Sequence, residues 1–221
     1  MPEQRVGWLG GSFNPVHEGH LYLARSAIEQ LGLTSVYLVP AATPPHKQTH
    51  ELASGKDRME LLHIATREDP MLIPHDVELR RAGISYSLET AVSLLSELPE
   101  GATLFALVGS DTLHDLPQWH QIESMTDLVT FCPLARSGVA PEITGLTEAL
   151  GEAACQRILD HVISRPEHPA SSSAIRATIA RGETPQWLAP DVLQAIHDMG
   201  IYGIGGGCTP NSDVTSSDSN P

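Results

Sequence analysis

The stretch RVGWLGGSFNPVHEGH, residues 5–20, joins an apolar run, two adjacent glycines and two histidines. Its first part is short and apolar and ends in Gly10 and Gly11, which predicts a buried strand followed by a tight loop. Residues 21–33 then carry apolar side chains at helical spacing, and Gly32 is a typical helix stop. The stretch therefore predicts a strand, a glycine loop and a helix in that order.

The same alternation continues along the chain. Apolar blocks predict further strands, and amphipathic segments predict helices between them. The predicted strands cover residues 35–40, 71–79, 103–111 and 127–134, and the predicted helices cover residues 57–68, 87–98, 143–161, 171–182 and 190–200. Strands that alternate with helices over short connections are typical of α/β proteins, so we expect a doubly wound parallel sheet with a Rossmann-like fold.

Length and composition limit the class of protein. A chain of 221 residues has room for one substantial domain, which we expect over residues 1–203. Residues 204–221 carry almost no large apolar side chains, which predicts a disordered tail. We find no apolar run of the roughly 18 residues that a membrane span needs and no basic segment leading into a long apolar core at the N-terminus. The 3 cysteines form no CxxC pair, which favours a reducing cytoplasm.

The chain is strongly acidic, with a formal net charge of −14. Nucleic acids and anionic membranes bind to positive surfaces, so the charge argues against both as partners. Any phosphate that this protein binds must therefore be held by a few local groups.

The residues that follow the first predicted strand are suited to hold a phosphate. Ligands of doubly wound sheets lie at the carboxyl ends of the strands, where Gly10 and Gly11 allow close backbone approach. His17 and His20 are three residues apart at the predicted helix start, beside its free N–H groups, which suits a polyphosphate. Two other interpretations remain open. The histidines could merely cap the helix or lie on the surface, or they could bind zinc, although HxxH lacks the glutamate of HExxH and no third ligand is evident.

Two motifs carry a resemblance to a known family. GGSFNPVHEGH resembles the signature of the nucleotidyltransferase superfamily that carries a (T/H)xGH motif, at residues 17–20, and residues 170–176 resemble its second signature, ISSTxIR. Over residues 5–202 the chain is most similar to bacterial nicotinate mononucleotide adenylyltransferases. The resemblance implies a nucleotidyltransferase fold and transfer of AMP from ATP to nicotinate mononucleotide in NAD biosynthesis, with Mg²⁺ accompanying ATP. The implied partners are these substrates, and the sequence leaves open whether the chain forms a homo-oligomer.

The resemblance also implies roles for individual residues. The catalytic set is His17, His20 and Arg176. The expected ATP-binding residues are Gly10, Gly11, Ser12, Phe13, His17, His20, Gly109, Asp111, Ser172, Ser173 and Arg176. The expected mononucleotide-binding residues are His46, Lys47, Tyr86, Ser87 and Trp119. No protein metal ligand is implied. One departure from the family pattern is Asn14, which stands where aspartate is frequent.

Each role has an ordinary structural alternative. The serines before residue 174 and Asp111 could simply cap helices, Lys47 could be solvated, and Trp119 could belong to the core. At the level of the whole protein, two alternatives remain. One is another nucleotidyltransferase, such as pantetheine-phosphate adenylyltransferase, although PPHK, SYS and PQW are not its pattern. The other is a nucleotide-binding regulator without catalysis, against which the intact histidines and Arg176 argue.

Overall fold

The computed structural model describes residues 4–42, 52–81, 86–136, 138–139 and 141–203, with the backbone alone at residues 110, 111, 136 and 144. Within these residues, strands and helices alternate along the chain as predicted. The strands are β1 (Arg5–Gly11), β2 (Ser35–Pro40), β3 (Leu72–Pro74), β4 (Thr103–Gly109), β5 (Thr130–Arg136) and β6 (Ile163–Arg165). The helices are α1 (Glu18–Leu31), α2 (Gly55–Thr66), α3 (Val77–Arg81), α4 (Ser87–Glu97), α5 (Ile122–Leu128), α6 (Thr144–Leu159), α7 (Ser172–Ala180), α8 (Pro190–Met199) and the 3₁₀ helix η2 (Ser110–Gln118).

The six strands form one parallel sheet in the order β3-β2-β1-β4-β5-β6. This order confirms the prediction of a doubly wound, Rossmann-like sheet. β1 lies in the middle and pairs with β2 on one side and β4 on the other. The strand order reverses at β1 and β4, and ligands of such folds bind beside the carboxyl ends of the strands at that point.

Helices cover both faces of the sheet, because β1 and β4 are apolar on both faces. Leu9 and Leu107 belong to the core that is completed by α1, α2, α7 and α8. Trp8 and Ala106, one residue earlier in each strand, belong to the core that is completed by α3, α4, α5, α6 and η2. The alternation of side chains along a strand therefore sends neighbouring residues to opposite cores.

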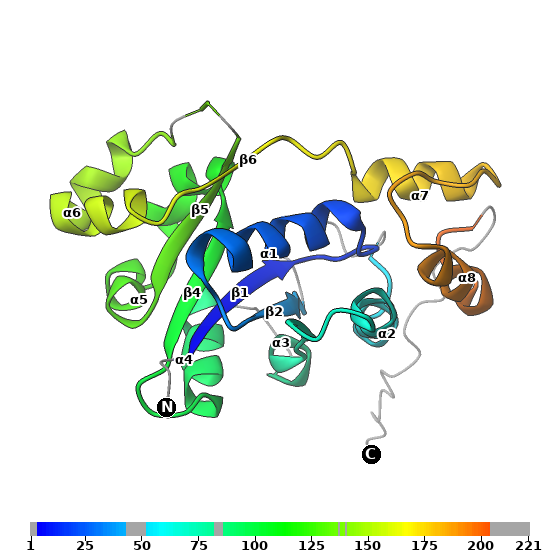
Figure 1. Cartoon of the computed structure of the whole chain (residues 1–221), viewed down its shortest axis with the longest axis horizontal. Helices are drawn as coiled ribbons and strands as arrows, with labels where there is room; N and C mark the ends of the chain where they lie inside the picture. The colour runs from blue at the N-terminus through cyan, green and yellow to red at the C-terminus, as the bar shows by residue number, and fades with distance from the viewer. Residues whose placement is uncertain (1–3, 43–51, 82–85, 137, 140, 204–221) are drawn as a thin grey trace, which may run out of the picture.

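The last two helices lie beyond the end of the sheet. In Figure 1, α7 and α8 stand on the right, next to the start of α1, and α8 packs against α2. Ile175 and Val192, from these two helices, are 3% and 1% exposed in the core that contains the α1 side chains. The C-terminal helices are thereby fixed beside the loop that leaves β1.

The structure differs from the sequence-based expectations in three places. Residues 71–79 form a strand only at Leu72–Pro74 and continue as α3, since a proline inside a strand lacks the N–H that a sheet ladder needs. β6 was missed because three residues carry too little pattern to be recognised. The predicted helix over residues 143–161 is interrupted at Gly151, whose φ is 77°. Residues 204–221, predicted to be a disordered tail, lie outside the described residues.

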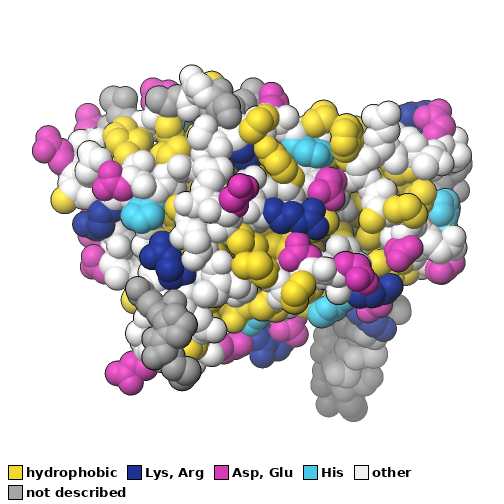
Figure 2. Space-filling model, viewed as in Figure 1, with side chains coloured by type: hydrophobic (Ala, Val, Ile, Leu, Met, Phe, Trp, Pro, Cys, Tyr) yellow, Lys and Arg dark blue, Asp and Glu magenta, His cyan; other side chains and the backbone are white. Residues whose placement is uncertain are grey.

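The surface matches the acidic composition. On the face that Figure 2 shows, Lys and Arg side chains are dispersed among acidic ones and form no continuous basic area. Among the described residues, no helix is long and apolar enough to cross a membrane.

Candidate active site

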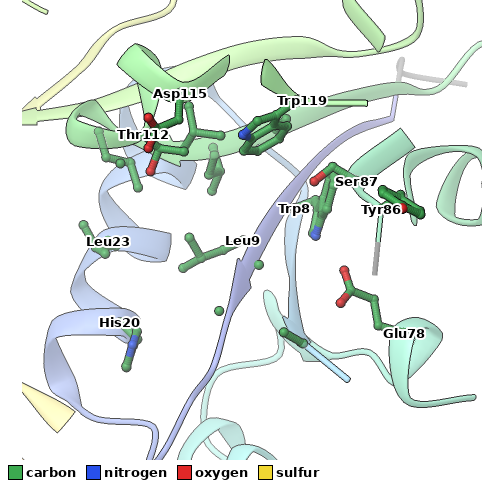
Figure 3. A pocket seen from close by; sticks show the side chains of 18 of the residues that line it. Trp8, Leu9, His20, Leu23, Glu78, Tyr86, Ser87, Thr112, Asp115 and Trp119 are labelled. Carbon is green, nitrogen blue, oxygen red and sulfur yellow. The ribbon is translucent and has the colours of Figure 1, made fainter. Parts of the chain in front are cut away.

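A cleft of about 810 Å³ opens at the carboxyl ends of β1 and β4. It lies at the position where the strand order reverses, which is where the fold class predicts a ligand. Figure 3 shows its walls, with β1 between the start of α1 on one side and the start of α4 on the other. Seven of the residues predicted for the site line this cleft: Gly10, Gly11, His20, Tyr86, Ser87, Gly109 and Trp119.

The two histidines of the HxxH motif are in direct contact. His17 is the N-cap of α1, and its backbone N–H donates to Nδ1 of His20 over 3.2 Å. The two rings stack, with 3.8 Å between their centroids. Because Nδ1 of His20 accepts a hydrogen bond, the proton of its neutral ring is on Nε2. His20 lines the cleft and can thus offer an N–H donor from the helix start.

His17 differs from His20 in its surroundings. It is 8% exposed, and burial together with the neighbouring His168 lowers the pKa of His17 from 6.5 to about 4. Its ring is therefore neutral at pH 7. His17 can donate a hydrogen bond to a phosphate but brings no positive charge of its own.

Acidification is expected to destabilise the fold through His17. Between pH 6.5 and about 4 the unfolded state binds a proton at His17 that the folded state does not bind. The free energy of unfolding should therefore fall as the pH falls, with a slope approaching about 1.4 kcal/mol per pH unit. His17→Asn keeps a residue suited to an N-cap and should remove this contribution. Urea unfolding of both proteins from pH 4 to 7 measures the difference, and parallel stability curves would contradict the prediction.

The helix start at α7 meets the loop that follows β1, although the two segments are far apart in the chain. The Ser172 hydroxyl donates to the carbonyl of Pro15 over 3.0 Å, and Nη1 of Arg176 donates to the carbonyl of Asn14 over 2.8 Å. Gly19 allows this approach, since a Cβ there would lie 3.2 Å from Cβ of Ala170. The two predicted phosphate motifs therefore lie side by side.

The other residues expected near ATP take different positions. Phe13 is 1% exposed, and its ring centroid lies 4.9 Å from that of His20. It therefore packs against the imidazole and does not line the cleft. Ser12 contributes its carbonyl to a contact with the protein itself. Ser173 is exposed at the start of α7. The side chain of Asp111 lies outside the described residues.

Sequence reasoning missed Arg58, which is 1% exposed at the start of α2. Its guanidinium donates to three backbone carbonyls from separate segments, those of Ser12 (2.9 Å), Ala41 (2.8 Å) and Ala53 (3.0 Å). Burial lowers the pKa of Arg58. A signal was present in the sequence, because Arg58 lies three and four residues before Leu61 and Leu62, on the buried face of the helix.

Asn14 is a second anchor of the same loop. It is 5% exposed, and its Oδ1 accepts hydrogen bonds from the Ala53 N–H over 3.0 Å and from the Tyr202 hydroxyl over 2.5 Å. Burial raises the pKa of Tyr202, so its hydroxyl stays protonated and can donate. Asn14 stands where aspartate is frequent in the family, and its side chain still provides an oxygen acceptor. This acceptor connects the loop to the C-terminal segment.

The far end of the cleft contains the residues expected to bind the mononucleotide. Ser87 begins α4, and Tyr86 before it is 40% exposed, with its ring centroid 4.9 Å from that of His120. Trp119 lines the cleft and also packs edge-on against Phe131, with 6.2 Å between the ring centroids. The cleft-lining and core interpretations of Trp119 therefore both apply. His46 and Lys47 lie outside the described residues.

Comparisons with known proteins agree with this geometry. A family model described as Cytidylyltransferase-like matches residues 8–178. A probable nicotinate-nucleotide adenylyltransferase of Geobacillus kaustophilus (strain HTA426) is 31% identical over 206 residues, covering 93% of this chain and 89% of the relative. One of the same name from Synechococcus sp. (strain JA-3-3Ab) is 35% identical over 195 residues, covering 87% and 91%.

A solved structure extends the comparison to the fold. The nicotinic acid mononucleotide adenylyltransferase of Plasmodium falciparum, in complex with NaAD, superposes with a TM-score of 0.69 at 17% identity, covering 90% of this chain and 98% of that one. This likeness independently supports the fold. From the family match and the curated relatives together, the chain belongs to the cytidylyltransferase-like family and, within it, to the nicotinate-nucleotide adenylyltransferases.

Proposed function

We propose that this protein transfers AMP from ATP to nicotinate mononucleotide, giving nicotinate adenine dinucleotide and pyrophosphate. The observation that carries the proposal is the meeting of two helix starts, those of α1 and α7, on one loop beside the cleft. Free N–H groups and hydroxyls at helix starts are suited to phosphates. The names of the curated relatives support the substrates and favour this enzyme over the pantetheine-phosphate enzyme.

The reaction needs no covalent intermediate on the protein. An ionised oxygen of the mononucleotide phosphate attacks the α-phosphorus of ATP, a new P–O bond forms, and the bond to the bridging oxygen of the β-phosphate breaks. The electron pair leaves with pyrophosphate. The protein's task is to position both substrates and to stabilise the charge that develops on the transferred group.

We assign the stabilisation of this developing charge to His20 and Arg176. His20 would donate through Nε2–H, since Nδ1 accepts the hydrogen bond from the His17 backbone. Arg176 already uses Nη1 to hold the Asn14 carbonyl. The guanidinium carries further N–H groups on its other nitrogens, and these would contact the phosphates. Ser172, Ser173 and the exposed start of α7 would contribute to the same anion site.

Mg²⁺ is expected to enter with ATP. Among the described residues, no group of three or more His, Cys, Asp and Glu side chains could hold a metal ion. Mg²⁺ is commonly bound through substrate phosphates and only one or two carboxylates, and the proposal follows that pattern. When bound, Mg²⁺ would neutralise negative charge on the phosphate oxygens. A cytoplasmic location, with no nucleic acid or membrane as partner, belongs to the same proposal.

A pyrophosphate-release assay tests the function directly. The purified protein is incubated with ATP and either nicotinate mononucleotide, nicotinamide mononucleotide or phosphopantetheine. We expect release only with pyridine mononucleotides, and faster with the nicotinate form. Faster release with phosphopantetheine would support the pantetheine-phosphate enzyme, and no release with any acceptor would support a regulator.

Replacing Trp119 by alanine is expected to raise KM for nicotinate mononucleotide about tenfold and leave KM for ATP within about twofold. The indole offers a flat face on which a pyridine ring can stack, and aromatic pairs contribute about 1 kcal/mol beyond the area they bury. Steady-state kinetics with each substrate varied in turn measure both constants. Trp119→Phe, which keeps an aromatic face, serves as the control and should recover most of the loss. Equal increases in both KM values would contradict a stacking role.

A further inference from the structure

One polar atom in the wall of the cleft has no role in the reaction described so far. Trp8 lies in the middle of β1 and is 6% exposed, and its ring lines the cleft. Its Nε1 is buried and has no hydrogen-bond partner. A buried donor without an acceptor costs free energy comparable to a lost hydrogen bond, and such groups are rare in folded proteins.

The packing around Trp8 does not account for this N–H. Trp8 belongs to a core of apolar side chains that includes Ala91 and Leu94 of α4. A leucine or phenylalanine would fill such a space without an unpaired donor. The carboxylate of Glu78 faces the indole nitrogen in Figure 3, but it accepts its hydrogen bond from the Thr90 hydroxyl, over 3.0 Å. The donor is therefore unexplained by the protein's own contacts.

The residue next to Nε1 on the same face of β1 is a glycine. Gly10 follows two residues later on the same face of β1, and a Cβ there would lie 3.6 Å from Nε1. Its absence leaves space beside the indole nitrogen. In Figure 3, Trp8 lies between Ser87 and Glu78, with Tyr86 next to it. The start of α4, with its free N–H groups, is thus on the same side of the cleft.

On this basis we propose that Trp8 recognises the substrate: its Nε1–H donates a hydrogen bond to a carboxylate oxygen on the pyridine ring of the mononucleotide. The inference rests on the function proposed above and adds a residue to it. The phosphate groups are expected at the other end, near the starts of α1 and α7, so an acceptor beside Trp8 belongs to the pyridine end. A charged oxygen gains more from such a donor than a neutral one.

The nearby acidic side chain, Glu78, already accepts a hydrogen bond from another donor. Glu78 shares the Thr90 hydroxyl with Arg81, whose Nη2 donates to it over 3.2 Å. The Thr90 hydroxyl therefore lies between the Glu78 carboxylate and the Arg81 guanidinium, whose Nε also pairs with Glu89 over 3.2 Å. Because Nε1 is covered, an incoming oxygen reaches it only after a neighbouring group moves.

Trp8→Phe tests the proposal, because it removes the N–H and keeps an aromatic ring. We expect Kd and KM for nicotinate mononucleotide to rise about tenfold, those for nicotinamide mononucleotide about threefold or less, and KM for ATP to stay within about twofold. The ratio by which the protein prefers nicotinate mononucleotide over nicotinamide mononucleotide should therefore become smaller. Calorimetric titration with each mononucleotide and steady-state kinetics supply the values.

Two further variants of this protein serve as a control and as a second replacement at position 8. Trp187→Phe removes an indole N–H from a side chain that is 46% exposed and does not line the cleft, and should change none of these constants. Benzothienylalanine at position 8 replaces the N–H by sulfur at nearly constant shape, so it should reproduce the loss even where Trp8→Phe packs poorly.

The outcomes separate this inference from the function on which it rests. If the native protein turns over nicotinate mononucleotide but both replacements at position 8 bind it within twofold of native, the role of Trp8 is wrong and the function stands. Equal losses for the acid, the amide and ATP would likewise overturn substrate recognition by Trp8. A native protein inactive with either mononucleotide would overturn the proposed function first.

Discussion

His20→Ala is expected to lower kcat by about 100- to 1,000-fold, with a smaller effect on KM. Removing a single donor that acts on developing charge has effects of this size in other enzymes. The contact between Nδ1 of His20 and the His17 backbone fixes the ring, so the Nε2–H donor needs no reorganisation during the reaction. Alanine removes the donor and the contact together.

The measurement is pyrophosphate release at saturating ATP and nicotinate mononucleotide, with the free energy of unfolding recorded for the same protein. His63→Ala is a matched control, because His63 is exposed on α2 and does not line the cleft. The control should retain native turnover. A folded His20→Ala protein with a kcat within a few-fold of native would exclude the assigned role.

Arg58→Met is expected to lower the free energy of unfolding by about 3 kcal/mol. Methionine fills part of the volume but leaves the carbonyls of Ser12, Ala41 and Ala53 without their donor. Each buried acceptor without a partner costs about 1–3 kcal/mol. The total cost is smaller than three such losses, because methionine also removes the cost of desolvating the buried guanidinium charge. KM for ATP should rise as well, since the loop before His17 loses the hydrogen bond that Arg58 donates to the Ser12 carbonyl.

Urea unfolding measures the stability change, and steady-state kinetics measure KM. Arg67→Met provides the comparison: its side chain is 60% exposed near the end of α2, and its ion pair with Asp191 spans 3.7 Å between exposed groups. Such pairs contribute about 0–1 kcal/mol, so this variant should remain close to native. Equal stability losses in the two variants would show that the three carbonyl contacts of Arg58 contribute little.

Much of the fold was predictable because long periodic segments carry strong signals. β1, β2, β4, β5 and most helices were predicted near their observed bounds. β6, α3, α5 and η2 were not predicted, since segments of three to nine residues hold little pattern to distinguish strand, helix and loop. The break of α6 at Gly151 was also missed, because an isolated glycine in a helical pattern is usually tolerated.

The site was predictable to the extent that its residues form local motifs. The HxxH pair and the serine–arginine segment each carry a helix-start signal that can be read from neighbouring residues. Asn14 carries no such signal, and the place of Arg58 on the apolar face of α2 indicates its burial but not the carbonyls that it contacts. Their partners lie up to 188 and 46 residues away, and a hydrogen bond to a distant carbonyl leaves no local pattern.

The sequence by itself determined the parallel α/β architecture, the glycine loop after β1 and the two helix starts suited to phosphate, because periodicity and capping depend on residues close in the chain. Only the tertiary structure decided that these helix starts share one loop. It also decided that His17 is buried and neutral, and that the Trp8 N–H lies unpaired in the cleft wall. Burial and long-range contacts depend on how distant segments pack together, which local sequence does not specify.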